Sequence, residues 1–130
     1  MATERTLVFV YGTLKRGASN HTVMAGQQFV GEARTPPGHR LFVVADYPGL
    51  VRDPTDTRGV QGEVWSVDAD ALRTLDRFEG VEEKLYRRGP IPLLPPFDTA
   101  SVDGYFYLRT VRGRRPLVDG VWPVRVVPVG

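Results

Sequence analysis

The sequence predicts an α+β fold, a small mixed β-barrel with one to three short helices, built as a single domain over residues 1–130. Three observations support this prediction. Short apolar runs are separated by Gly and Pro clusters, only one segment has a strong helical pattern, and the length suits one packed core. Many short strands with few helices favour a closed or nearly closed barrel, because closure leaves no exposed sheet edge.

Alternation of apolar and polar residues predicts the strands. They are expected at 7–11, 29–34, 40–45, 60–67, 86–93, 101–109 and 123–127. Turn signals separate them at Pro36-Pro37-Gly38, Tyr47-Pro48-Gly49, Asp53-Pro54, Pro95-Pro96 and Gly113. The strand at 101–109 carries aromatic rings on both faces, so one face is expected to line an aromatic pocket.

One helix is clearly indicated between residues 68 and 80. Asp68 is a suitable N-cap, and Gly80 suits the C-terminal stop. An apolar stripe along one face consists of Leu72, Leu75 and Phe78. Glu79 therefore lies at the helix end, where the negative end of the macrodipole is expected to raise its pKa. A second, shorter helical turn is expected within residues 20–27.

The composition excludes several classes of protein. The chain has no cysteine, which rules out disulfides, thiolate metal sites and a cysteine nucleophile. No apolar stretch approaches the roughly 20 residues of a membrane span, and residues 1–6 lack the features of a signal peptide. We therefore expect a cytoplasmic protein with no membrane partner. Nucleic acid is not an expected partner either, because the arginine clusters at 87–88 and 112–115 lack an interleaved aromatic platform.

The most distinctive motif is an apolar strand that runs into a glycine-bounded turn over residues 7–17. Gly12 and Gly17 allow the backbone to bend and to direct amide N–H groups toward an anionic ligand. The turn is not a P-loop, because Ala18 and Ser19 stand where that motif needs Lys and then Ser or Thr. A serine-hydrolase G-x-S-x-G elbow is also absent from the sequence. The turn is therefore a candidate cradle for a small molecule.

Titratable side chains leave alternatives open. Two histidines are too few and too far apart for a zinc site, and no metal or other cofactor is expected. His39 is expected at the surface, whereas His21 directly follows the cradle and is either a surface histidine or a substrate contact. By its spacing alone, Glu79 is either a solvated helix-end glutamate or a catalytic carboxylate. Three neighbouring acids have the pattern of ordinary surface charges: Asp76, Glu82 and Glu83.

Two groups of residues resemble the gamma-glutamylcyclotransferase superfamily, which includes gamma-glutamylamine cyclotransferases and plant AIG2-like proteins. The first is VFVYGTLKRG at 8–17, followed by Asn20-His21, which is similar to the family's Tyr-Gly-Thr-Leu loop. The second group follows in the family's order and consists of GEVW at 62–65, LDRFEG at 75–80 and YRR at 86–88. The resemblance covers about residues 7–109.

The resemblance implies a cofactor-independent enzyme that converts a small gamma-glutamyl substrate to 5-oxoproline and a free amine. It implies that Glu79 is the general acid/base. Substrate binding is implied for Tyr11, Gly12, Thr13, Leu14 and Tyr86 and, by strand position, for Tyr105 and Tyr107. The α-amine of such a substrate attacks its own γ-carbonyl, so no enzyme nucleophile is needed. The leaving amine, the subclass and the oligomeric state stay open, and the alternative is a non-catalytic binding module for a small carboxylate-bearing ligand.

Overall fold

The computed structural model describes residues 4–124. Its elements are β1 (Arg5–Val10), the 3₁₀ turn η1 (His21–Met24), β2 (Gln28–Arg34), β3 (His39–Val43), β4 (Pro48–Arg52), β5 (Gln61–Asp68), α1 (Ala69–Phe78), β6 (Tyr86–Pro90), β7 (Val102–Tyr107) and β8 (Pro116–Leu117). The mixed α+β class with few helices is therefore confirmed.

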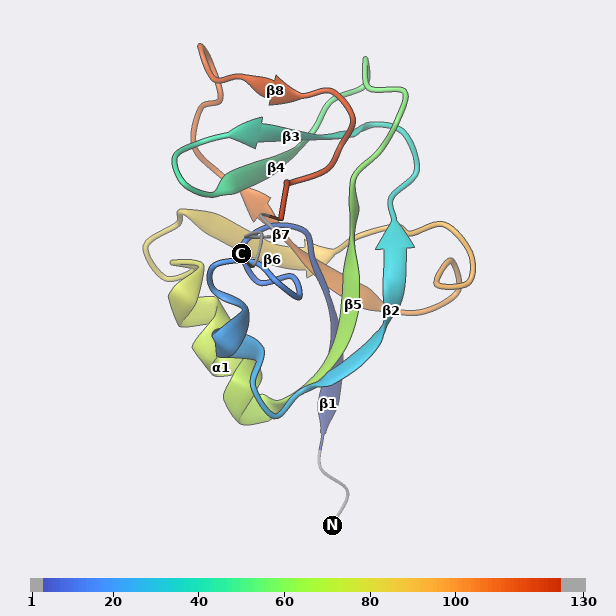
Figure 1. The fold of residues 1–130 in the computed structure, drawn as a ribbon, viewed down its shortest axis with the longest axis vertical. Helices are drawn as coiled ribbons and strands as arrows, with labels where there is room; N and C mark the ends of the chain where they lie inside the picture. The colour runs from blue at the N-terminus through green and yellow to red at the C-terminus, as the bar shows by residue number, and fades with distance from the viewer. Residues whose placement is uncertain (1–3, 125–130) are drawn as a thin grey trace, which may run out of the picture.

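The strands form two sheets (Figure 1). The larger sheet has the order β2-β5-β1-β7-β6, in which only the pairing of β1 with β7 is parallel. The smaller sheet has the order β4-β3-β8. The two sheets meet where Gly49 of β4 lies against the ring of Tyr107, so closely that a Cβ at Gly49 would be 2.7 Å from it. Within residues 4–124 neither sheet closes on itself, so the strand pairing does not confirm a closed barrel.

Two strands were not expected from the sequence. Tyr47-Pro48-Gly49 has the composition of a turn, yet β4 begins at Pro48. Proline is tolerated there because, within residues 4–124, β4 is an edge strand that pairs with β3 alone. The short strand β8 completes the other edge of the smaller sheet. Of the strand expected at 123–127, residues 123 and 124 are not in a strand and the others lie outside the described residues.

The helix forms where its capping residues predict it. The Asp68 carboxylate accepts a hydrogen bond from the Ala71 N–H at 2.8 Å, and Gly80 ends the helix with a φ of 64°. Leu75 is buried, whereas Phe78, expected on the same apolar stripe, is 43% exposed. No helix within residues 4–124 is long and apolar enough to cross a membrane.

The larger sheet is packed on both faces. Phe9 of β1 points toward the smaller sheet and packs in one cluster with Leu41 and Leu50. Val8 and Val10 point the other way, into a second cluster. The second cluster also holds Leu75 of α1, and β7 contributes Phe106 to the first cluster and Tyr105 to the second. The rings that alternate along β7 are therefore packed on both faces of the strand.

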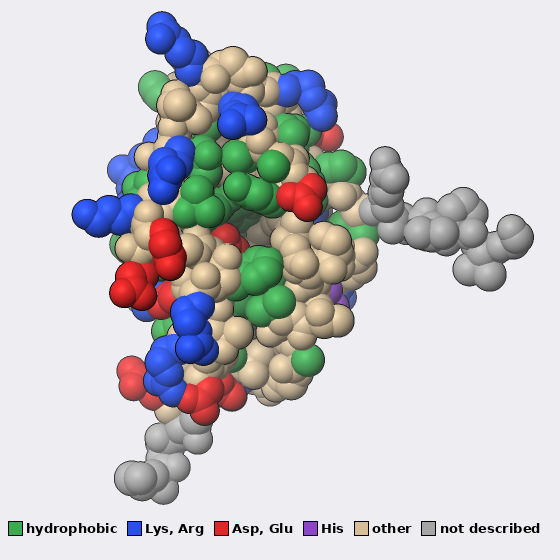
Figure 2. Space-filling model, turned by 90° about the vertical axis from the view of Figure 1, so that its left-hand side faces the viewer, with side chains coloured by type: hydrophobic (Ala, Val, Ile, Leu, Met, Phe, Trp, Pro, Cys, Tyr) green, Lys and Arg blue, Asp and Glu red, His purple; other side chains and the backbone are tan. Residues whose placement is uncertain are grey.

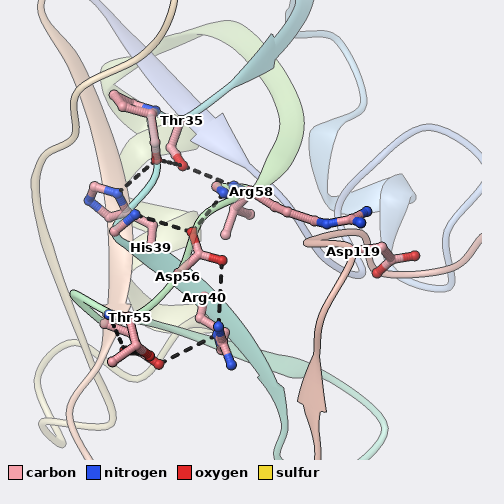
Figure 3. A network of polar contacts seen from close by, with 12 residues as sticks. Thr35, His39, Arg40, Thr55, Asp56, Arg58 and Asp119 are labelled. Atoms are coloured by element: carbon pink, nitrogen blue, oxygen red, sulfur yellow. Dashed lines mark hydrogen bonds and ion pairs between the residues drawn. The ribbon is translucent and has the colours of Figure 1, made fainter.

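A buried polar network joins the β2–β3 turn to the loop before β5 (Figure 3). The Asp56 carboxylate accepts hydrogen bonds from the N–H groups of Gly38 at 3.1 Å and Gly59 at 2.7 Å, and Arg40 lies 3.9 Å away. His39 lies in this network and is only 7% exposed, so the expectation of a surface histidine is wrong. Burial lowers the pKa of its imidazole. The network fixes the smaller sheet to the larger one.

Candidate active site

A cavity of about 240 Å³ opens between the end of β1, the C-terminus of α1 and the β3–β4 hairpin. Figure 2 shows it as a hollow edged by hydrophobic side chains, with acidic side chains both inside it and at its rim. The lining is mostly apolar and aromatic, and it comprises Phe9, Val10, Tyr11, Gly12, Thr13, Leu14, Asn20, Asp46, Tyr47, Pro48, Phe78, Glu79, Leu85, Tyr86 and Tyr105. The expected cradle and the expected carboxylate thus share one cavity.

The cradle turn starts where β1 ends. Gly12 is required there, because a Cβ would lie 2.8 Å from two side-chain atoms of Pro48. The turn is closed by hydrogen bonds from the Lys15 N–H to the Gly12 oxygen at 3.2 Å and from the Asn20 N–H to the Thr13 oxygen at 2.8 Å. Within residues 4–124, the N–H groups of Gly12, Thr13 and Leu14 have no protein acceptor. Three consecutive backbone donors therefore remain for a ligand.

A second carboxylate fixes the far side of the turn. Glu63 of β5 accepts hydrogen bonds from the Arg16 backbone N–H at 3.0 Å, the Arg16 Nε at 2.9 Å and the Trp65 Nε1 at 3.1 Å. These hydrogen bonds lower the pKa of Glu63 despite its burial. His21 Nδ1 lies 3.0 Å from the Leu14 oxygen and its ring packs on Trp65. His21 therefore supports the turn and is not part of the cavity lining.

Three buried tyrosines form the inner wall. Their hydroxyl groups donate to protein acceptors: Tyr11 to the Tyr105 oxygen at 2.7 Å, Tyr86 to the Pro48 oxygen at 2.6 Å, and Tyr105 to Asp76 Oδ1 at 2.8 Å. Burial raises the pKa of all three phenols, so they stay neutral. Because the protons of Tyr86 and Tyr105 are engaged within the protein, these two phenol oxygens are left as acceptors for a ligand, whereas the Tyr11 oxygen already accepts from the Leu50 backbone N–H.

The structure does not bring Tyr107 into the cavity. Its ring packs against Tyr86, with centroids 5.3 Å apart, and against Gly49 of β4. It lies behind the lining and supports it. Tyr105 and Tyr107 lie on the same face of β7, but only Tyr105 reaches the cavity.

Glu79 is the C-cap residue of α1, and its backbone N–H donates to the Leu75 oxygen at 2.9 Å. Its carboxylate lines the cavity, and within residues 4–124 it forms no ion pair. Burial raises its pKa from 4.5 to about 7. The direction matches the sequence prediction, and the cause is desolvation of the buried carboxyl group. A carboxyl group with a pKa near neutrality can both accept and donate a proton at pH 7.

Asp76 is not the ordinary surface charge that its sequence context indicates. It is half-buried one turn before Glu79, and it accepts hydrogen bonds from Tyr105 and from Arg88 Nε, the latter at 2.9 Å. Arg88 also pairs with Asp103 at 2.7 Å. This set of contacts connects the end of α1 to β6 and β7, and it holds the inner wall beside Glu79. No group of three or more acidic or histidine side chains suited to a metal ion occurs within residues 4–124.

Comparison with known proteins identifies the family. The family described as gamma-glutamyl cyclotransferase, AIG2-like, matches residues 8–124. The chain belongs to this family. A putative gamma-glutamylcyclotransferase of Vibrio cholerae is 42% identical over 120 residues, which cover 92% of this chain and 97% of that protein. The human gamma-glutamylaminecyclotransferase is 42% identical over 89 residues, which cover 63% of this chain and 58% of that protein.

Solved structures show the same fold. A uropathogenic E. coli-specific protein matches with a TM-score of 0.75 and 30% identity over 92% of this chain and 93% of that one. A mouse AIG2-like protein matches with a TM-score of 0.67 and 31% identity over 82% of this chain and 78% of that one. The predicted family resemblance is confirmed, and the names of the relatives support an enzyme of the gamma-glutamylcyclotransferase type.

In this AIG2-like family member, one side of the cavity is formed by residues that the sequence does not indicate as part of a site. Asp46, Tyr47 and Pro48 come from the β3–β4 hairpin, whose composition predicts only a turn. Phe78 and Leu85 flank the glutamate and complete the opening. The sequence offers one local signal for this side of the cavity. The Pro48-Gly49 pair beside Tyr47 is also compatible with a hairpin whose tip carries functional side chains.

Proposed function

We propose that this chain is a gamma-glutamyl(amine) cyclotransferase in which Glu79 acts as the general acid/base. The observation that carries the proposal is the meeting of two features in one cavity. A carboxyl group with a pKa of about 7 shares it with a turn whose backbone N–H groups at 12–14 have no acceptor within residues 4–124. The first feature suits proton transfer and the second suits a developing oxyanion.

The reaction needs no enzyme nucleophile. Glu79 removes a proton from the substrate's α-ammonium, and the freed α-amine attacks the γ-carbonyl carbon to form the five-membered ring. The carbonyl oxygen becomes an oxyanion, which the N–H groups of Gly12, Thr13 and Leu14 stabilise. When the bond from the γ-carbon to the leaving nitrogen breaks, Glu79 returns the proton to that nitrogen. The ring nitrogen still carries one proton more than the lactam, and Glu79 removes it and passes it to the released amine, which leaves as an ammonium ion. The products are 5-oxoproline and a free amine, and the glutamate ends in its starting state.

The raised pKa of Glu79 makes the first proton transfer less costly. Moving the carboxyl pKa from 4.5 to about 7 brings it closer to that of an ammonium group, which lowers the cost of the transfer by about 3 kcal/mol. Each well-placed oxyanion donor typically contributes about 3 kcal/mol more. Ring closure within one molecule supplies the remaining advantage, since the amine and the carbonyl are held together covalently.

The tyrosine wall fits the same substrate. An ammonium group needs acceptors, and the oxygens of Tyr86 and Tyr105 can accept because their protons are donated to the protein. Their rings keep the inner end of the cavity dry, which strengthens the electrostatic interactions there. Tyr11, Tyr86 and Tyr105 therefore bind and orient the γ-glutamyl group without taking part in proton transfer.

The proposal is tested by incubating the protein with γ-glutamyl conjugates of amines and amino acids and measuring 5-oxoproline by mass spectrometry. We expect turnover by the wild-type protein and a loss of 10²–10⁴-fold in kcat/KM for Glu79→Gln, which is the usual contribution of a general acid/base. Glu82→Gln removes an exposed carboxylate three residues away and serves as the matched control. No 5-oxoproline from any conjugate, together with equal ligand-induced thermal stabilisation of wild-type and Glu79→Gln proteins, would instead indicate a binding module.

A further inference from the structure

The charges around the cavity are unevenly distributed. Its lining contains two acidic side chains, Glu79 and Asp46, and no lysine or arginine among residues 4–124. The carboxylate of a γ-glutamyl group therefore meets neutral donors in this lining, such as the side chains of Thr13, Asn20 and Tyr47. A second carboxylate elsewhere on the substrate would find no positively charged partner in the lining.

The cavity has a closed end and an open end. The closed end is made of buried residues, including Tyr11, Tyr86 and Tyr105. Asp46 and Phe78 are exposed and mark the open end. The γ-glutamyl group is common to all substrates and fits the closed end, beside the groups that perform the reaction. The leaving amine differs between substrates, so it extends toward the open end, where its size is not restricted.

Asp46 is available to a ligand. Within residues 4–124 it takes part in no ion pair. The connection between β7 and β8 carries three arginines, Arg112, Arg114 and Arg115, and within residues 4–124 none of them pairs with Asp46. Arg114 donates instead to the backbone oxygen of Val44 at 2.7 Å. The carboxylate of Asp46 thus adds an uncompensated negative charge at the mouth of the cavity.

We propose that Asp46 is a specificity-determining residue that favours leaving amines with a second, positively charged end, such as aliphatic diamines, over leaving groups that carry a carboxylate. The inference rests on the proposed function and identifies its substrate class. Asp46 is exposed, so each charge effect is at most about 5-fold, which corresponds to about 1 kcal/mol. Attraction of a cation and repulsion of an anion act in the same direction, and both weaken as salt is added.

Three conjugates of matched length test the proposal. They join the γ-carboxyl of glutamate to 1,4-diaminobutane, pentylamine or 5-aminopentanoate, which end in a cation, a methyl group or a carboxylate. The readout is kcat/KM for 5-oxoproline release at low and high salt. For the wild-type protein we expect the diamine conjugate to exceed the carboxylate conjugate by about 5-fold or more at low salt. Asp46→Asn should bring the two values together, and Asp46→Lys should reverse their order.

Asp98→Lys is the matched control, since it makes the same change in net charge at an exposed position of the loop between β6 and β7, outside the cavity lining (Figure 1). It should keep the wild-type order. An unchanged order in Asp46→Lys, or the same reversal in Asp98→Lys, would overturn the proposal.

The uncharged pentylamine conjugate tests the proposed function separately. If the wild-type protein turns over none of the conjugates, that function fails. The charge preference is then read from their dissociation constants by calorimetry, where equal values for wild-type and Asp46→Lys proteins overturn the inference.

Discussion

Replacing Glu79 with glutamine is expected to stabilise the folded protein at pH 8 while it removes turnover. The folded-state pKa of Glu79 is about 7, above its ordinary value of 4.5, because the carboxyl group is buried. A group with a raised pKa contributes its full stability below pH 4.5, and that contribution is lost as the pH rises through 7. Glutamine has nearly the same shape and no charge to desolvate, so it avoids this loss.

The magnitude follows from the two pKa values. At pH 8 the ionised carboxylate costs the folded state about 3 kcal/mol, and at pH 5 it costs under about 1 kcal/mol. For a domain of this size, about 3 kcal/mol corresponds to roughly 10 °C in Tm. Thermal denaturation followed by circular dichroism at pH 5 and pH 8 measures both differences. Glu82→Gln controls for the loss of one negative charge. If Glu79→Gln gains no more stability at pH 8 than at pH 5, the carboxylate is well solvated and the account of its pKa is wrong.

Three further predictions concern the surroundings of the site. Gly12→Ala places a Cβ against Pro48, so we expect the unfolding free energy to fall by about 1–3 kcal/mol and KM to rise; an unchanged KM would contradict the close packing. Arg88→Lys keeps the charge but cannot reproduce the contacts with both acidic partners, so urea denaturation should show a loss of about 1–2 kcal/mol, and an unchanged midpoint would argue against the network. The folded state lowers the pKa of Asp56, so its contribution to stability is present above pH 3.8 and disappears as the pH falls through its lower folded-state pKa. Asp56→Asn should therefore lower the free energy of unfolding by about 2 kcal/mol at pH 7, and the variant should lose less stability on acidification than the wild-type protein.

Local signals predicted the helix well. Asp68 caps it, Gly80 ends it in the left-handed region, and both effects depend on residues within one turn of the helix. The smaller sheet was harder to predict, because whether Pro48 breaks a strand depends on the strand's place in the sheet. An edge strand tolerates the missing N–H group, and the sequence alone does not say which strand lies at an edge.

The site was predictable only in part. The cradle turn could be identified from its glycines, whereas the case for Glu79 came from the resemblance and not from its spacing. Asp76 was misjudged because its partners Tyr105 and Arg88 come from distant strands. Asp46 was missed for the same reason, since only the packing of the hairpin against the cradle turn brings it to the cavity. Tertiary packing brings Asp76 to its partners and Asp46 to the cavity, and this packing is not evident from the local sequence.

The pH dependence of kcat/KM for 5-oxoproline release tests the central claim most directly. The γ-glutamyl conjugate of pentylamine is the suitable substrate, because its leaving group carries no additional charged group. The account predicts that kcat/KM rises with pH along a limb with an apparent pKa of about 7 in the wild-type protein, and that this limb is absent from the residual activity of Glu79→Gln. A limb below pH 5, or an identical limb in both proteins, would contradict the role of Glu79.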